Sequence, residues 1–564
     1  MLTQTLVPAP ATLRSRRTQL AYDKASNRIA YGSGKNVYIR SVEDPTKCVV
    51  YEKHINPVTA VAFSPTGSYV VSGDQNGEAH VWGLNGDEIV HKTTVQATNG
   101  RINSVAWDFE TKRVFAVGNG TQRFGHAFMF DSGNSVGEIS GHPSEVYGVA
   151  LRPSRPPRAV TVGEDGALVF YHGAPYKFEK TVKKHTGSIW DVAYSPSGEK
   201  FVSVGSDRQV IIYDGKTGDF ETLIDTKHSG SIFAVSWKDD NTIVTASADA
   251  TVKLTDISTN KVLESWDLPK ELANFQVGVV AAGEKVISLG FNGDLYYWKQ
   301  GETKPTRVLQ GHQKGVSALL VADNIFSSSS DGNVLKWTDG LAKRLDETHN
   351  CPVVGLLNYK DELVSAGWDK TLATLEGKTA ATLSAQPIAL TSDGSTVYSV
   401  SESGFEVVGG DAVAIDRCAT LDAHDGLVAV GHELTVSLYR DSKLEFDFPA
   451  GRMTISCVKF SPNGEYLAVG DTSGKIVLYD AKSHQIVTSR WTFHSSKVTS
   501  IAWHKDGERA VTGALDNNLF VYSVKKGKTH KIEAAHRDGV TQVSWLNDDI
   551  VSAGNDGSIK IWTL

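Results

Sequence analysis

The sequence predicts an all-β fold of two seven-bladed WD-repeat β-propellers in tandem, and three observations carry this prediction. A unit of about forty residues recurs along the chain, as in 184–214, 227–256, 493–523 and 535–564. Each unit alternates apolar and polar residues with the period of a β-strand. Fourteen such units can be counted, with degenerate ones near residues 274, 385 and 420. Four strands per unit at this period is the signature of propeller blades.

Each unit repeats the same elements in the same order, and the unit after His185 shows them clearly. An alternating strand, SIWDVAYS (188–195), ends in a Ser-Pro-x-Gly turn. A strand of small and β-branched residues (201–205) follows, then a tight turn that contains Asp207 and an alternating strand with an aromatic residue (210–214). A looser fourth strand closes the unit. The pattern therefore predicts a four-stranded antiparallel sheet for each unit.

The number of units predicts where the chain divides. A propeller ring usually holds four to eight blades, so fourteen units divide most simply into two rings of seven. The boundary falls before GHQKGVSALL (311–320), which predicts one propeller over 18–310 and a second over 311–564. The last unit reaches only its third strand at Trp562. We expect residues 1–17 to close the second ring, with LTQTLVPAP (2–10) as the missing outer strand.

Composition narrows the class of protein. A net charge of −7 over 564 residues does not favour a nucleic-acid or membrane-surface partner. The four cysteines are scattered without a close pair, which fits a reducing compartment and predicts neither a disulfide framework nor a zinc motif. Neither a signal peptide nor a membrane-spanning apolar run is evident. A monomeric cytoplasmic protein is expected.

Histidines and aspartates recur at fixed places in the units, and this regularity argues for a structural role. Such a histidine usually bonds a serine or threonine and an aspartate of its own blade, and a turn aspartate orders its own backbone. Tryptophans at one strand position are expected to pack. No catalytic motif, metal site or cofactor site is predicted. The histidines that open units are His54, His142, His185, His228, His312, His349, His494 and His536.

The region 118–190 departs from this regularity. The stretch AVGNGTQRFGHAFMFD (116–131) has four more residues between Gly118 and Asp131 than the equivalent stretch has between Gly205 and Asp214. Basic residues then gather beside Glu164, Asp165 and Glu179, with Phe124, Tyr176 and Phe178 among them. Such a surface suits either a protein interface or solvated loops, and the residues alone do not decide between them. The basic residues are Arg152, Arg155, Arg158, Lys177, Lys180, Lys183 and Lys184.

Three motifs of this region resemble the actin-interacting protein 1 family: QRFGHAFMFD (122–131), PSRPPRAVTVGEDG (153–166) and GAPYKFEKT (173–181). The resemblance implies tandem double propellers that act without enzymatic activity and without a cofactor. It also implies binding to actin filaments together with cofilin (ADF), disassembly and severing of cofilin-decorated filaments, and capping of barbed ends.

The resemblance also implies which residues bind actin or cofilin. Carried over by motif, the contacts fall on Gln122, Glu164, Phe178 and Ser188. The family often has an acidic residue where Gln122 stands and an aromatic one where Ser188 stands. The neighbours included in the predicted surface are Arg123, Phe124, Asp165, Lys177, Lys183 and Lys184.

Three other functions stay open on the sequence. A general WD-repeat scaffold unrelated to actin usually carries a helical adaptor segment, and the chain reads as propeller throughout. A propeller enzyme would need a convergent polar cluster, which no motif marks. Nucleic-acid binding through the basic stretch runs against the acidic net charge.

Overall fold

The computed structural model describes residues 1–121, 123–345, 349, 351–359, 362–374, 376 and 378–564. These residues form 14 four-stranded sheets, which confirms the predicted all-β propeller fold and the count of fourteen units. Within the described part of the chain the one helical element is a short 3-10 turn, η1 (Leu272–Asn274). A search of the same residues finds no helix that is long and apolar enough to span a membrane.

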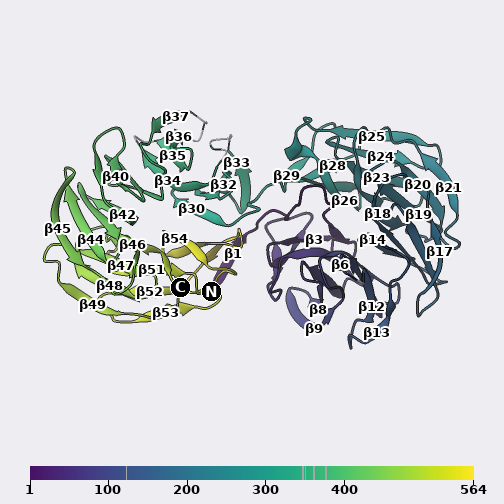
Figure 1. Ribbon diagram of the computed structural model, residues 1–564, viewed down its shortest axis with the longest axis horizontal. Helices are drawn as coiled ribbons and strands as arrows, with labels where there is room; N and C mark the ends of the chain where they lie inside the picture. The colour runs from purple at the N-terminus through teal and green to yellow at the C-terminus, as the bar shows by residue number, and fades with distance from the viewer. Residues whose placement is uncertain (122, 346–348, 350, 360–361, 375, 377) are drawn as a thin grey trace. The chain divides into compact units, whose positions relative to one another are not determined.

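The sheets belong to two compact units. The N-terminal unit is Ala9–Leu309, and the C-terminal unit combines Met1–Pro8 with Gln310–Leu564. In each unit the sheets follow one another around a ring, with first strands toward the middle and fourth strands at the rim (Figure 1). First strands of neighbouring sheets are in contact, and the β2–β26 and β30–β54 contacts close the two rings.

The N-terminal unit contains seven sheets. In chain order its strands are β2 (Ala21–Asp23), β3 (Arg28–Ser33), β4 (Asn36–Ser41), β5 (Cys48–Tyr51); β6 (Val58–Phe63), β7 (Tyr69–Asp74), β8 (Glu78–Asn85), β9 (Glu88–Gln96); β10 (Ile102–Trp107), β11 (Arg113–Gly118), β12 (Gly125–Met129), β13 (Ser135–Glu138); β14 (Val146–Leu151), β15 (Arg158–Gly163), β16 (Leu168–His172), β17 (Lys177–Val182); β18 (Ile189–Tyr194), β19 (Lys200–Gly205), β20 (Val210–Asp214), β21 (Phe220–Ile224); β22 (Ile232–Trp237), β23 (Thr242–Ser247), β24 (Thr251–Asp256), β25 (Lys261–Asp267); β26 (Gln276–Ala282), β27 (Lys285–Gly290), β28 (Leu295–Lys299) and β29 (Arg307–Leu309).

The C-terminal unit also contains seven sheets. Its strands are β30 (Val316–Val321), β31 (Ile325–Ser329), β32 (Val334–Thr338), β33 (Leu341–Arg344); β34 (Val353–Tyr359), β35 (Glu362–Gly367), β36 (Thr371–Thr374), β37 (Thr379–Thr382); β38 (Ala389–Ser392), β39 (Val397–Ser401), β40 (Gly404–Val407), β41 (Ala412–Ala414); β42 (Cys418–His424), β43 (Leu427–His432), β44 (Thr435–Arg440), β45 (Lys443–Pro449); β46 (Ile455–Phe460), β47 (Tyr466–Asp471), β48 (Ile476–Asp480), β49 (Ile486–Trp491); β50 (Val498–Trp503), β51 (Arg509–Ala514), β52 (Leu519–Ser523), β53 (Thr529–Ile532); β54 (Val540–Leu546), β55 (Asp549–Gly554), β56 (Ile559–Trp562) and, from the start of the chain, β1 (Leu2–Leu6).

Strand β1 pairs antiparallel with β56, so that Leu6 lies opposite Ile559. The side chain of Leu6 is buried against the core formed with Val316 and Leu335. The paired strand is shorter than the segment 1–17 that the sequence suggested. Residues 9–17 lie with the N-terminal unit, where the Ala11 amide donates to the Gly32 carbonyl. That each unit folds as an independent domain stays a prediction.

Burial explains the residue types of the four strand positions. In β19 every residue after Lys200 is buried, whereas most of β17 is exposed. A strand that has a paired strand on each side and a packed sheet on each face is fully buried, so its sequence is a continuous run of small and β-branched residues. A rim strand faces water and therefore carries polar residues. The apolar clusters fill the space between adjacent sheets, as where Phe115 packs with Val149 and Tyr171.

The histidines that open units are structural, as the sequence predicts. In all eight, Nε2 lies 2.7–3.0 Å from a serine or threonine hydroxyl of the same sheet. In six of them Nδ1 also lies within 3.2 Å of an aspartate carboxylate. Three tryptophans extend this network by donating from Nε1 to the serine that a histidine bonds: Trp82, Trp337 and Trp562. Trp298 donates in the same way to Ser288, in a sheet that no such histidine opens.

Candidate partner-binding surface

The predicted contact residues lie mainly at one end of three neighbouring sheets in the N-terminal unit. In an antiparallel sheet of consecutive strands, the turn between the second and third strands lies at the same end as the connection to the next sheet. The β11–β12 turn, the β15–β16 turn and the β17–β18 connection therefore share this end. We call it the candidate face; it holds Arg123, Phe124, Glu164, Asp165, Lys183, Lys184 and Ser188.

The β11–β12 turn is longer than its counterparts, but by two residues and not the four that the sequence suggested. Six residues (119–124) separate β11 from β12, whereas four (206–209) separate β19 from β20. Arg113 pairs with Met129 as Lys200 pairs with Asp214, so Met129, and not Asp131, is equivalent to Asp214. An alignment that matches Asp131 with Asp214 is therefore out of register by two residues, and this accounts for the difference between four and two.

A tight backbone fixes the shape of this turn. The Gly118 amide donates to the Phe124 carbonyl at 2.8 Å. A Cβ atom on Gly120 would lie 1.9 Å from the Arg123 carbonyl oxygen, so the turn needs glycine there. Phe124 is half-buried against the core between two sheets. Arg123 is exposed and pairs with Glu138 at 2.6 Å. The predicted contact Gln122 lies outside the described residues.

Glu164 and Ser188 come together across two sheets. The Ser188 hydroxyl donates to the Glu164 carbonyl at 3.2 Å. The Glu164 amide donates to the Glu145 carbonyl at 2.9 Å, which leaves the Glu164 side chain exposed. The candidate face therefore holds the exposed Glu164 side chain and the partly exposed Ser188, which is joined to the Glu164 main chain.

Asp165 points inward, and its carboxylate belongs to the structural network. It accepts from the Ala167 amide at 3.0 Å and lies 3.1 Å from His142 Nδ1. Burial opposes ionisation, but these hydrogen bonds and the nearby charge of Lys183 together lower the pKa of Asp165. The Asp165 carboxylate thus holds the turn beside Glu164, and its role as a direct contact stays a prediction.

Lys177 and Phe178 begin the rim strand β17, and they differ in what they reach. Lys177 pairs with His172 at the end of the sheet opposite the candidate face. The Phe178 ring lies over Gly141, where a Cβ atom would come within 3.0 Å of it, and Gly141 precedes β14 at the candidate face. Phe178 remains 48% exposed. It therefore forms an aromatic patch at the outer edge of the candidate face, and Lys177 does not join it.

The basic stretch of the sequence divides between the two ends of the sheets. Arg155 pairs with Glu110 at 2.7 Å, and the buried Arg152 reaches Glu199 at 3.3 Å; both lie in the β14–β15 turn at the end opposite the candidate face. Lys183 and Lys184 are exposed at the candidate face, and Lys184 Nζ lies 5.1 Å from the Phe220 ring centroid. Antiparallel strands reverse direction, so neighbours in sequence separate in space.

Some residues of the candidate face carry no signal in the sequence. Arg16 donates twice to the Glu145 carboxylate, at 2.6 and 3.2 Å, and this hydrogen bonding raises the pKa of Arg16. Asn103 also donates to Glu145 at 2.9 Å. Arg16 lies 129 residues from Glu145 in the chain, and only the folded ring brings them together. A composition of exposed charges, peptide groups and one half-exposed aromatic ring suits protein binding.

The fold and its histidine network define a WD-repeat β-propeller protein. The model of the WD domain, G-beta repeat, family matches residues 46–83, 176–214, 221–256, 303–338, 443–480, 485–523 and 527–563. An uncharacterized WD repeat-containing protein of Schizosaccharomyces pombe is 34% identical over 100% of this chain and 99% of its own length. Actin-interacting protein 1 of Caenorhabditis elegans is 31% identical over 98% of both chains. WD repeat-containing protein 1 of Gallus gallus is 30% identical over 96% of this chain and 95% of its own. The chain belongs to the actin-interacting protein 1 family.

Proposed function

We propose that this chain binds actin filaments, promotes the disassembly and severing of filaments decorated by cofilin, and caps the barbed ends that result. Family membership supports the actin partner, since relatives from Caenorhabditis elegans and Drosophila melanogaster are named for interaction with actin. The observation that carries the proposal is convergence: residues of three separate motifs, Arg123, Glu164 and Phe178, lie on or beside the candidate face. Cofilin, severing and capping rest on the family resemblance.

Each exposed group of the candidate face has a distinct proposed role. Phe178 is the aromatic anchor, because a half-exposed ring gains most when a partner covers it. Glu164 supplies an exposed carboxylate, and Ser188 is held beside the Glu164 main chain. Lys183 and Lys184 attract an acidic partner over distance. A closed ring holds these groups rigid, which lowers the entropy lost on binding a polymer of fixed geometry.

Preference for the decorated filament follows from thermodynamic linkage. If the chain binds the cofilin-bound filament more tightly than the bare filament, it stabilises the cofilin-bound state by the same coupling free energy. Disassembly needs no chemistry from this chain, because ATP hydrolysis belongs to actin. The proposed protein acts as a monomer on the cytoplasmic actin cytoskeleton, without a nucleic-acid or membrane partner.

The test measures how much of the chain pellets with cofilin-decorated filaments. Phe178→Ala is expected to weaken binding at least about thirtyfold, because removing an interface hot spot costs about 2 kcal/mol or more. The matched control is Phe446→Ala, which removes a ring of similar exposure (41%) from rim strand β45 of the C-terminal unit. We expect that control to bind like the parent chain.

Two outcomes of this test distinguish an error in the proposed site from an error in the proposed function. Unchanged pelleting by a folded Phe178→Ala chain would overturn the site but leave actin binding standing. Failure of the parent chain to pellet with decorated filaments would overturn the function and favour a general WD-repeat scaffold unrelated to actin.

A further inference from the structure

One of the eight histidines that open units has a cysteine beside it. In each unit that opens with a histidine, the residue two positions further on lies in the same connection. At these positions stand Asn56, Ser144, Gly187, Gly230, Lys314, Cys351, Ser496 and Asp538. Cys351 is thus the one thiol in the set, and it follows His349 in the connection that leads from β33 to β34 of the C-terminal unit.

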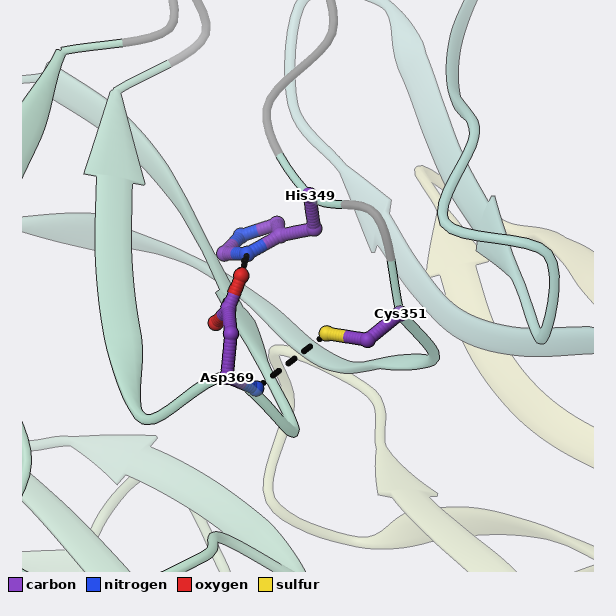
Figure 2. A group of neighbouring side chains, drawn as sticks. All are labelled: His349, Cys351 and Asp369. Atoms are coloured by element: carbon purple, nitrogen blue, oxygen red, sulfur yellow. Dashed lines mark hydrogen bonds and ion pairs between the residues drawn. The ribbon is translucent and has the colours of Figure 1, made fainter.

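The three side chains bring a nitrogen, a sulfur and an oxygen together (Figure 2). His349 Nδ1, Cys351 Sγ and an Asp369 carboxylate oxygen lie within 4.8 Å of one another. His349 Nδ1 is 2.9 Å from the Asp369 carboxylate, and the Asp369 amide donates to Cys351 Sγ at 3.2 Å. The turn between β35 and β36 carries Asp369, so two chain segments meet at this cluster. Gly367 packs directly against the ring, since a Cβ atom there would lie 2.5 Å from His349 Nδ1.

The hydrogen bonds of His349 differ from those of the other histidines. Its Nε2 lies 3.2 Å from the Ser365 carbonyl oxygen as well as 3.0 Å from the Ser365 hydroxyl. Without a metal, the Nδ1 proton donates to the Asp369 carboxylate and the Ser365 hydroxyl donates to Nε2. The Ser365 carbonyl gives Nε2 an acceptor as well, so the ring can move its proton to Nε2 and present the Nδ1 lone pair to a metal. The nearby Thr371 hydroxyl has one proton, and at 2.7 Å it donates that proton to Asp369.

A metal ion can take the place of the proton between His349 Nδ1 and Asp369, because the three ligand atoms lie close enough to share one ion. We propose that His349 Nδ1, Cys351 Sγ and the Asp369 carboxylate bind one zinc ion, with water as the fourth ligand. Zinc takes nitrogen, sulfur and oxygen ligands in a tetrahedron, at about 2.0–2.1, 2.3 and 2.0–2.2 Å respectively. The soft thiolate disfavours magnesium and calcium, which prefer oxygen alone.

The zinc ion has a path from solvent and a structural consequence. The Asp369 side chain is 35% exposed, while that of His349 is fully buried, so the ion enters from the Asp369 side. Bound zinc would tie the β33–β34 connection to the β35–β36 turn. Because a ligand that binds only the folded state stabilises it, zinc is expected to raise the unfolding temperature of the chain.

The experiment uses the full chain and zinc in competition with a chromophoric chelator. We expect one zinc ion per chain, and a loss of affinity of at least about tenfold in Cys351→Ser, since even an outer-sphere partner is worth that much. The matched control is Cys48→Ser, which removes the partly buried thiol of the N-terminal unit and is expected to leave zinc binding unchanged.

Cobalt(II) gives a second measurement, and its result in the parent chain does not depend on how a variant folds. In the parent chain and in Cys48→Ser, we expect a thiolate-to-cobalt charge-transfer band in the near ultraviolet, and in Cys351→Ser we expect none. Either of two results would overturn the proposal: no stoichiometric zinc binding by the parent chain, or equal binding by Cys351→Ser, which would mean adventitious surface ions only.

Discussion

Strand β1 supplies the fourth strand of the last sheet, and Leu6→Ala tests how much the C-terminal unit depends on it. The Leu6 side chain is 2% exposed and contacts a core that includes Val316, Leu335 and Ile559. Truncating a buried leucine to alanine costs about 2–5 kcal/mol, from lost apolar burial and the cavity left behind. The same change at Leu2, which lies on the same strand but is 44% exposed, is expected to cost about 0.5 kcal/mol or less.

Hydrogen exchange read by mass spectrometry locates the effect. Since each 1.4 kcal/mol is a factor of ten, Leu6→Ala is expected to speed exchange in β54, β55 and β56 by about 30-fold to several thousand-fold. Peptides from β14 to β16 in the N-terminal unit are expected to exchange as in the parent chain. Equal acceleration in both units would refute independent unfolding of the two units. No acceleration in β54–β56 would refute the contribution of β1.

Three further predictions concern the candidate face and the core. The double variant Lys183→Glu, Lys184→Glu is expected to associate more slowly with decorated filaments at low salt but not at high salt, and slowing that does not depend on salt would contradict electrostatic steering. The control variant Lys200→Glu, Lys216→Glu changes charges at the opposite end of β18–β21 and is expected to have little effect. Gly120→Ala is expected to weaken pelleting with decorated filaments at least about fivefold by reshaping the β11–β12 turn, and normal pelleting by this variant would contradict a role for the turn. The control variant Gly83→Ala, whose Cβ atom would make only ordinary contacts, is expected to pellet like the parent chain. Burial lowers the pKa of His312 to about 4; the charge of Asp331 opposes this shift and that of Arg344 adds to it. The neutral ring therefore contributes about 3 kcal/mol of stability, which is fully present above about pH 6.5 and is lost as the pH falls toward 4. In His312→Gln we expect the unfolding free energy measured with denaturant to change less across this pH range, and an unchanged pH dependence would contradict the assignment.

The repeated part of the fold could be predicted from the sequence because each unit repeats the same local sequence pattern. Alternation, Ser-Pro-x-Gly turns and a recurring histidine predict the fourteen sheets, and the serine or threonine partner of each histidine follows from the same rule. Register is harder to predict: two aspartates, Asp131 and Asp214, looked equivalent, and only strand pairing shows that Met129 occupies the place of Asp214.

The candidate site was predictable only in part. Family motifs pointed to Glu164 and Phe178, and these lie on or beside one face. The sequence could not separate Lys183 from Arg155, since it does not show which end of a sheet each residue occupies. Nor could it pair Arg16 with Glu145, or Cys351 with Asp369, because those contacts exist only once distant segments are folded together.

The central claim is that this chain disassembles actin filaments together with cofilin. The most direct measurement is the amount of actin left in the supernatant after high-speed sedimentation of filaments mixed with cofilin, with this chain, or with both. We expect the mixture with both proteins to release more actin than the sum of the two single additions. Release no greater than that sum, with the chain itself absent from the pellet of decorated filaments, would contradict it.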